Sequence, residues 1–160
     1  MSTFTRTATV VALVLTLAGC GAGKDAATLK PYTPTDGVQG SAQSVKVRDV
    51  VLVSMPDGTG VVVGTVVQTG STQDQITGIT VNGMPATVTP AAPVLTQNAA
   101  IRFSGDTANA SADIPGLNAV PGTLAKVEFT FGTSGTVSLD AVVRDNKDEF
   151  ASVSEAPFQG

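Results

Sequence analysis

The sequence predicts an all-β fold, a single β-sandwich with Greek-key connections that follows an export signal and a tether. Short runs rich in Val, Ile and Thr recur along the chain, separated by Gly, Pro, Asn and Asp, a composition typical of strands and turns. The last two runs alternate apolar and polar residues with a period of two, and no segment shows a helical period. A small β-barrel is the alternative architecture.

Residues 1–19 are expected to be a lipoprotein signal peptide. Arg6 precedes an apolar run that ends at Leu17, and Ala18 and Gly19 stand before Cys20, the only cysteine. The run is shorter than the roughly 20 apolar residues that span a bilayer, and its charged start and small-residue end are those of a secretion signal. The segment Leu17-Ala18-Gly19-Cys20 resembles a bacterial lipobox, which implies cleavage before Cys20 and a diacylglycerol on its thiol. An ordinary secretory signal with an incidental cysteine is the alternative.

The chain is then expected to continue as a lipidated N-terminus and flexible tether over residues 20–44. This stretch is rich in Gly, Ala, Thr, Pro and Ser, so it cannot bury enough apolar surface to offset the entropy of ordering. The alternative for residues 36–44 is a first edge strand. The sandwich domain is expected over residues 45–153, followed by a tail at 154–160.

The first half of the domain reads as strands joined by tight turns. Alternation begins at Val45 and leads into an apolar run that ends at Val53. Asp57-Gly58 then predicts a hairpin into the apolar run 61–67, and Asn82-Gly83 predicts a second tight turn. Other short strands are expected at 76–81, 86–88, 101–103 and 111–114, and the prolines after residue 88 indicate an edge strand or a crossover.

The last two strands form the clearest element, a hairpin turned by residues 132–135. Phe129 and Phe131 on the first strand, and Val137 and Leu139 on the second, occupy alternate positions. This alternation predicts that one face of the hairpin is buried and the other is wet. Phe129 and Phe131 are therefore expected to be core anchors, with Val137 and Leu139 across from them.

Composition narrows the possible functions. Without residues 1–19 the chain has 8 basic and 13 acidic residues, a net charge of −5, and it contains no histidine, no tryptophan and one tyrosine. The absence of histidine removes the usual proton shuttle and the commonest metal ligand. No basic run indicates nucleic acid or an anionic lipid surface, and few aromatic residues are available to stack on sugars. We expect no cofactor and no nucleic-acid partner.

The sequence offers little for catalysis, so we expect no enzyme and no catalytic residues. Lys46, Lys126 and Lys147 are the candidates to activate a serine, but their positions indicate solvated faces and a charged turn. Glu128 and Asp140 lie on adjacent strands beside Lys126, a pattern typical of cross-strand charge pairing. The mixed run 144–149 could offer oxygen ligands to calcium but reads as a solvated turn.

The order of these segments resembles the periplasmic copper chaperone family PCuAC, and more closely its actinobacterial lipoprotein branch of the LpqE type. The resemblance rests on the segment Gly64 to Ile79 (GTVVQTGSTQDQITGI), on Ile114-Pro115-Gly116-Leu117, and on the closing hairpin. It covers residues 45–145 and implies a cupredoxin-like sandwich, akin to the immunoglobulin-like class. In that family two histidines and two methionines hold Cu(I).

The ligand positions of the family are degenerate in this chain. Placing the family's Gly-Leu pair on Gly116-Leu117 puts its His-x-Met ligands near Ser111 and Asp113, and its other histidine near Thr89 or Pro90. None of these is the soft donor that Cu(I) prefers. Met84 is the weak remaining candidate, so no metal is expected, and gap-filling at a strand end is the alternative role of Met84 and Met55.

Two functions remain. The first is a non-catalytic envelope module, anchored at the extracytoplasmic face of the cell membrane by Cys20, that binds an unknown envelope protein or component. The alternative is a copper-chaperone-like, metal-handling protein with a degenerate site.

Overall fold

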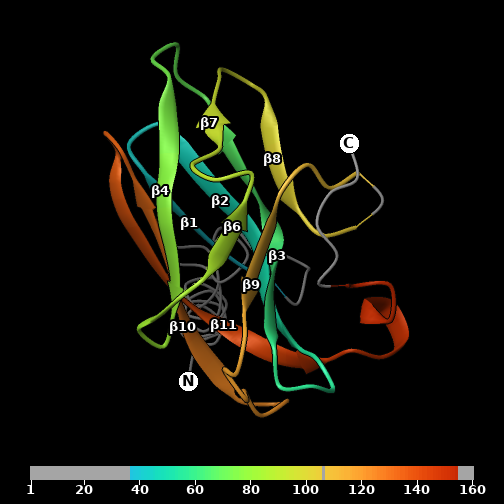
Figure 1. Cartoon of the computed structure of the whole chain (residues 1–160). Coiled ribbons are helices and arrows are strands. Elements are labelled where there is room, and N and C mark those ends of the chain that lie inside the picture. Colours follow the sequence, from blue (N-terminus) through green and yellow to red (C-terminus); the bar gives the residue numbers. More distant parts are fainter. Residues whose placement is uncertain (1–36, 106, 155–160) are drawn as a thin grey trace, which may run out of the picture. The chain divides into compact units, whose positions relative to one another are not determined.

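The computed structural model describes residues 37–105 and 107–154 of the chain, so the signal, Cys20 and most of the expected tether lie outside it. The described part is all-β, as predicted (Figure 1). Its strands are β1 (Val38–Ala42), β2 (Val45–Ser54), β3 (Gly60–Gln68), β4 (Asp74–Val81), β5 (Met84–Pro85), β6 (Thr87–Thr89), β7 (Val94–Leu95), β8 (Ala100–Phe103), β9 (Ser111–Ile114), β10 (Leu124–Phe131) and β11 (Gly135–Asp145). No helix among the described residues is long and apolar enough to cross a bilayer.

The strands form one hydrogen-bonded path that folds back on itself as a sandwich. Its order is β5-β4-β10-β11-β2-β3-β9-β6, with β1, β7 and β8 added to β2, β4 and β3. Strand β11 joins the two halves, because it pairs antiparallel with β10 up to Val142 and parallel with β2 from Val143 onward. Neighbours in this order are mostly not consecutive in sequence, so the chain crosses between the halves repeatedly.

The main core lies between these two halves. Alternate residues of β2, β4 and β10 point into it, and Leu52, Ile79 and Phe129 are at most 1% exposed. The rings of Phe103 and Phe129 meet in the core with centroids 6.3 Å apart and an interplanar angle of 54°, a tilted arrangement that aromatic pairs favour. The side chains that fill this core are therefore the apolar residues of the strands that the sequence predicted.

The turns follow the residues that predicted them. Asn82 and Gly83 have φ angles of 50° and 82°, and two positive φ values make the tight hairpin turn that suits the twist of paired strands. The loop with Asp57-Gly58 joins β2 to β3, and residues 132–134 join β10 to β11. Phe129 faces Val137, and Val127 faces Leu139, across the closing hairpin. Phe129, Phe131 and Val137 are buried as expected, and Leu139 packs against the core while partly exposed.

Three elements differ from the sequence expectations. Strand β1 lies within the stretch expected as tether and pairs with β2, which is the edge-strand alternative for residues 36–44. The short strand β7 was not expected, and it pairs with the start of β4. Residues Asp148–Phe150 form a 3₁₀ helix where a solvated turn was expected, because Phe150 and Val153 cover an apolar patch on the outer side of β2 and β3.

The side chain of Asn146 holds the segment with Phe150 and Val153, the C-terminal cover, in place over the apolar patch. Its amide nitrogen donates hydrogen bonds to the carbonyl oxygens of Phe150, at 2.8 Å, and Val153, at 3.0 Å. The patch underneath includes Val51, Val53 and Val61, which are at most 4% exposed. The apolar run in β2 is continuous in sequence because it is buried on both faces of the sheet.

Candidate metal centre

Strands β6 and β9 bring together the positions that the resemblance singled out. Thr89 lies directly opposite Ser111, and Thr87 lies directly opposite Asp113. Side chains of directly opposed residues share one face of a sheet, so the four polar side chains lie on one face of this strand pair. The intervening residue Ala112 points into the core and is 0% exposed. The resemblance pointed to Ser111, Asp113 and Thr89 in the sequence, but it missed Thr87. The available signal was the spacing of two residues between Thr87 and Thr89, which places both side chains on one face of a strand.

The oxygen atoms at this position are incompletely satisfied. Ser111 is 8% exposed, and its Oγ and the Oδ1 of Asp113 are buried without a hydrogen-bond partner in the described part of the chain. Burial raises the pKa of the Asp113 carboxyl, while the neighbouring Ser111 hydroxyl acts in the opposite direction.

The donor set does not fit Cu(I). It consists of three hydroxyl groups and one carboxyl group, which are hard oxygen donors, whereas Cu(I) prefers thioether, thiolate and imidazole groups. Among the described residues no group of three or more His, Cys, Asp or Glu side chains could hold a metal ion. The positions that the resemblance assigns to the ligands therefore carry oxygen donors only.

The methionines do not complete the site. Met84 lies on β5, paired with Val81 of β4, and is 37% exposed, so it is a surface side chain rather than a gap filler. Met55 packs against the outer apolar patch of β2 and β3, which agrees with a gap-filling role. The two thioethers therefore belong to separate surroundings, one on the surface and one in a packed cluster.

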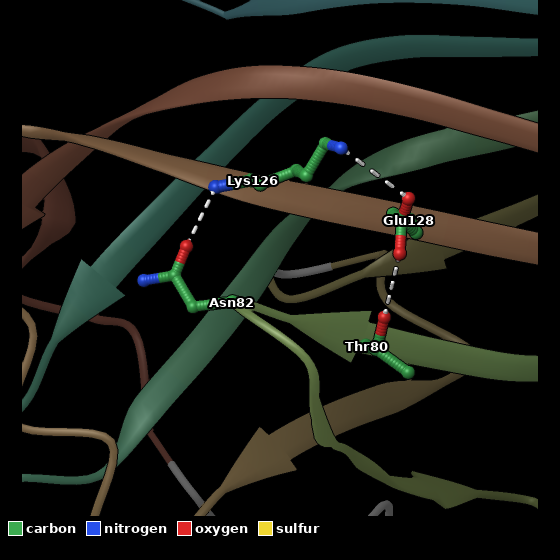
Figure 2. A network of polar contacts seen from close by, with 4 residues as sticks. All are labelled: Thr80, Asn82, Lys126 and Glu128. Carbon is green, nitrogen blue, oxygen red and sulfur yellow. Dashed lines mark hydrogen bonds and ion pairs between the residues drawn. The ribbon is translucent and has the colours of Figure 1, made fainter.

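The carboxylate of Glu128 takes part in a small polar network on the surface of the sheet. Figure 2 shows Lys126 Nζ 3.8 Å from Glu128 Oε1, and Thr80 donating a hydrogen bond of 3.4 Å to Glu128 Oε2. Asn82 accepts a hydrogen bond of 2.9 Å from the Lys126 backbone amide. Asp140 lies opposite Lys126 on β11. The ion pair thus joins two residues of the same strand, and the cross-strand contact of Glu128 is the hydrogen bond from Thr80, so Asp140 shares only a register position with Lys126.

An ion pair organises residues 144–149, the run of mixed charge at the end of β11. Lys147 Nζ lies 3.0 Å from Asp145 Oδ2. A hydrogen bond from Lys147 lowers the pKa of Asp145 and raises that of Lys147. Asp148 and Glu149 enter the 3₁₀ helix, so the acids of this run do not converge on one point.

Leu117, part of the Gly-Leu pair on which the resemblance rests, has a packing role. A side-chain carbon added to Gly60 of β3 would lie 2.5 Å from the Leu117 side chain, so Leu117 fits only because position 60 lacks one. The backbone amide of Asn118 donates a hydrogen bond of 2.9 Å to the backbone carbonyl oxygen of Gly58. The segment after β9 is thereby fixed against the β2–β3 hairpin, which explains this motif without a ligand.

Comparison with solved structures shows the same fold in PCuAC domains. A copper-bound PCuAC domain from PmoF2 superposes with a TM-score of 0.58 at 14% identity, covering 68% of this chain and 98% of that domain. An apo PCuAC domain from PmoF1 gives a TM-score of 0.58 at 17% identity, covering 68% and 99%. The apo PmoF2 domain gives 0.56 at 15% identity, covering 69% and 98%.

These similarities identify the class of fold, a cupredoxin-like β-sandwich like that of PCuAC domains, and confirm the resemblance to those domains at the level of the fold. No protein-family model matches the chain. No curated protein matches it either.

Proposed function

We propose that this chain is a non-catalytic, copper-chaperone-like domain with a degenerate metal site, held at the extracytoplasmic face of the membrane by an acylated Cys20. The shared fold with a copper-bound PCuAC domain favours this class over a binding module of unrelated origin. The motifs that resemble the LpqE-type lipoprotein branch support the same proposal. In this reading the domain serves as an envelope module that binds a protein or another envelope component.

One observation carries the proposal. The β6–β9 pairing sets Thr89 against Ser111 and Thr87 against Asp113, so the positions that the resemblance assigns to the ligands carry only oxygen donors. A chain that keeps the scaffold but replaces imidazole and thioether groups with hydroxyl and carboxyl groups gives up its affinity for Cu(I). The position is therefore better suited to a structural or partner-binding role than to copper transfer.

Titration with Cu(I) against a strong chelator tests this proposal. The chain from residue 20 onward is used as a Cys20→Ser variant, so that the only thiol does not bind the metal. We expect no stoichiometric Cu(I) to be retained, and we expect Met84→Ala to change nothing.

The second candidate function, copper handling, predicts the opposite result. It is favoured by the copper-bound state of one structural neighbour and by the exposure of Met84. Retention of one equivalent of Cu(I), lost in Met84→Ala, would replace the proposal with this candidate. A copper-loaded PCuAC domain serves as the positive control in the same titration.

A further inference from the structure

The sheet gathers three cationic side chains that are far apart in the sequence. Arg48 of β2 lies directly opposite Thr65 of β3, and Thr65 lies directly opposite Arg102 of β8. Lys46 precedes Arg48 by two residues and therefore lies on the same face. Val47 and Phe103, next to them in sequence, are buried on the other face. We call Lys46, Arg48 and Arg102 the basic patch.

The basic patch is available for binding. Arg48 and Arg102 are exposed and Lys46 is half-buried. Lys126 and Lys147 are engaged in ion pairs of 3.8 and 3.0 Å, whereas within the described residues no member of the basic patch takes part in one. The two arginines are separated by two strand spacings, about 10 Å. The domain thus concentrates positive charge on one face of a chain that is acidic overall.

An open hollow adjoins the patch. It has a volume of about 340 Å³ and is lined by Gln39, Gly40, Ser41, Lys46, Val47 and Arg48. Its lining is polar apart from Gly40 and Val47, and it lies where β1 pairs with β2. A charged group that enters this hollow meets Lys46 and Arg48 together with the Ser41 hydroxyl.

We propose that the basic patch and the adjoining hollow bind the phosphate groups of anionic phospholipids in the membrane that carries the anchor. Guanidinium groups match phosphate oxygens in geometry and charge, and a row of cations suits a surface of many headgroups. The choice of a membrane rests on the proposed acylation of Cys20. Sixteen residues separate Cys20 from Gly37, a length that reaches at most about 60 Å, and the chain then enters β1 beside the hollow. An anchored domain therefore stays within reach of the headgroups.

Vesicle binding by a chain that cannot be acylated tests the patch independently of the anchor. The chain from residue 20 onward, as Cys20→Ser, is titrated with vesicles of phosphatidylcholine mixed with phosphatidylglycerol and with vesicles of phosphatidylcholine alone. We expect binding to the anionic vesicles that weakens as salt is added. Binding to the two kinds of vesicle with equal affinity would overturn the proposal. A negative result here would not bear on the acylation of Cys20, which fatty-acid labelling tests separately.

Matched double variants locate the binding surface. Arg48→Gln/Arg102→Gln should bind anionic vesicles about 25-fold more weakly, since each cation at a membrane contributes roughly fivefold. Lys126→Gln/Lys147→Gln removes the same charge elsewhere and should lose less than about twofold on that basis. Both variants change exposed side chains, and equal thermal unfolding midpoints would show that the fold is intact. Equal losses in the two variants would overturn the assignment to this face.

A competition experiment separates headgroups in a membrane from a free anion. Inorganic phosphate should displace the protein from vesicles no more than sodium chloride of equal ionic strength, because the patch is spread over β2 and β8, with β3 between them, rather than closed around one ion. Displacement by phosphate well beyond the chloride control would overturn the membrane assignment in favour of a discrete phosphate site.

Discussion

At the scale of single residues, Asp74 makes the densest set of hydrogen bonds among the buried polar groups. It is 6% exposed, and its carboxylate accepts hydrogen bonds from the backbone amides of Gln75 at 2.8 Å and of Thr133 and Ser134 at 2.9 Å. Burial alone would raise the pKa of Asp74, but these bonds and one from the Ser134 side chain outweigh it and lower the pKa. The carboxylate at the start of β4 therefore ties down the turn between β10 and β11.

Asp74→Ala should lower the free energy of unfolding by about 2 kcal/mol at neutral pH, because it leaves three backbone amides without their charged acceptor. Asp140→Ala, which removes an exposed carboxylate from β11, should change it by less than about 0.5 kcal/mol. Urea unfolding followed by circular dichroism measures both. Similar losses at the two positions would mean that the Asp74 bonds contribute nothing specific.

The same residue gives the fold a predictable response to acid. The folded pKa of Asp74 lies below its ordinary value of 3.8, so the unfolded chain binds the proton more readily. The stabilisation is complete well above pH 3.8 and is lost as the pH falls through the folded pKa. The difference in stability between the parent chain and Asp74→Ala should accordingly shrink below that pH.

At the scale of elements, the closing hairpin of β10 and β11 connects the two halves of the sandwich. Strand β10 pairs with β4 on one side and β11 on the other, and β11 passes on to β2. Phe129, at the centre of this arrangement, is 0% exposed and contacts the ring of Phe103 on β8. A change at this position is therefore felt in both halves of the domain.

Phe129→Ala should cost about 3–5 kcal/mol of unfolding free energy, the usual effect of emptying a packed aromatic site. Lys126→Ala, on the exposed face of the same strand, should cost less than about 1 kcal/mol, since its ion pair with Glu128 is solvated. Chemical denaturation of the two variants gives the comparison. Equal costs would show that the two faces of β10 are assigned wrongly.

At the scale of the whole molecule, the proposed anchor decides where the domain works. Cys20→Ser in the full chain should leave an uncleaved precursor or release protein into the medium, because no thiol is available for the diacylglycerol. Incorporation of labelled fatty acid, followed in a bacterium that processes lipoproteins, measures this directly. Equal incorporation into the parent and the Cys20→Ser chain would rule out the anchor. Each buried CH₂ group of an attached acyl chain adds about 0.8 kcal/mol of membrane affinity.

Much of the architecture could be predicted from the sequence by itself. The β-branched runs, the Asn82-Gly83 turn and the alternation around Phe129 are local patterns, and local patterns determine strands, turns and buried faces. The likeness to PCuAC domains and the lack of histidine were also visible there. Strand β1 was only an alternative to the tether, and the cover formed by Phe150 and Val153 was not foreseen, because the burial of both depends on partners distant in sequence.

Only the tertiary structure decided which polar side chains meet. The pairing of β6 with β9 sets Thr87 against Asp113, and no periodicity within either strand reveals that register. A basic surface could not be recognised in the sequence, since its cations are scattered and outnumbered by acids. Placing β3 between β2 and β8 brings Arg48 and Arg102 onto one face. A surface charge pattern depends on which strands are neighbours, and strand order is a property of the folded chain.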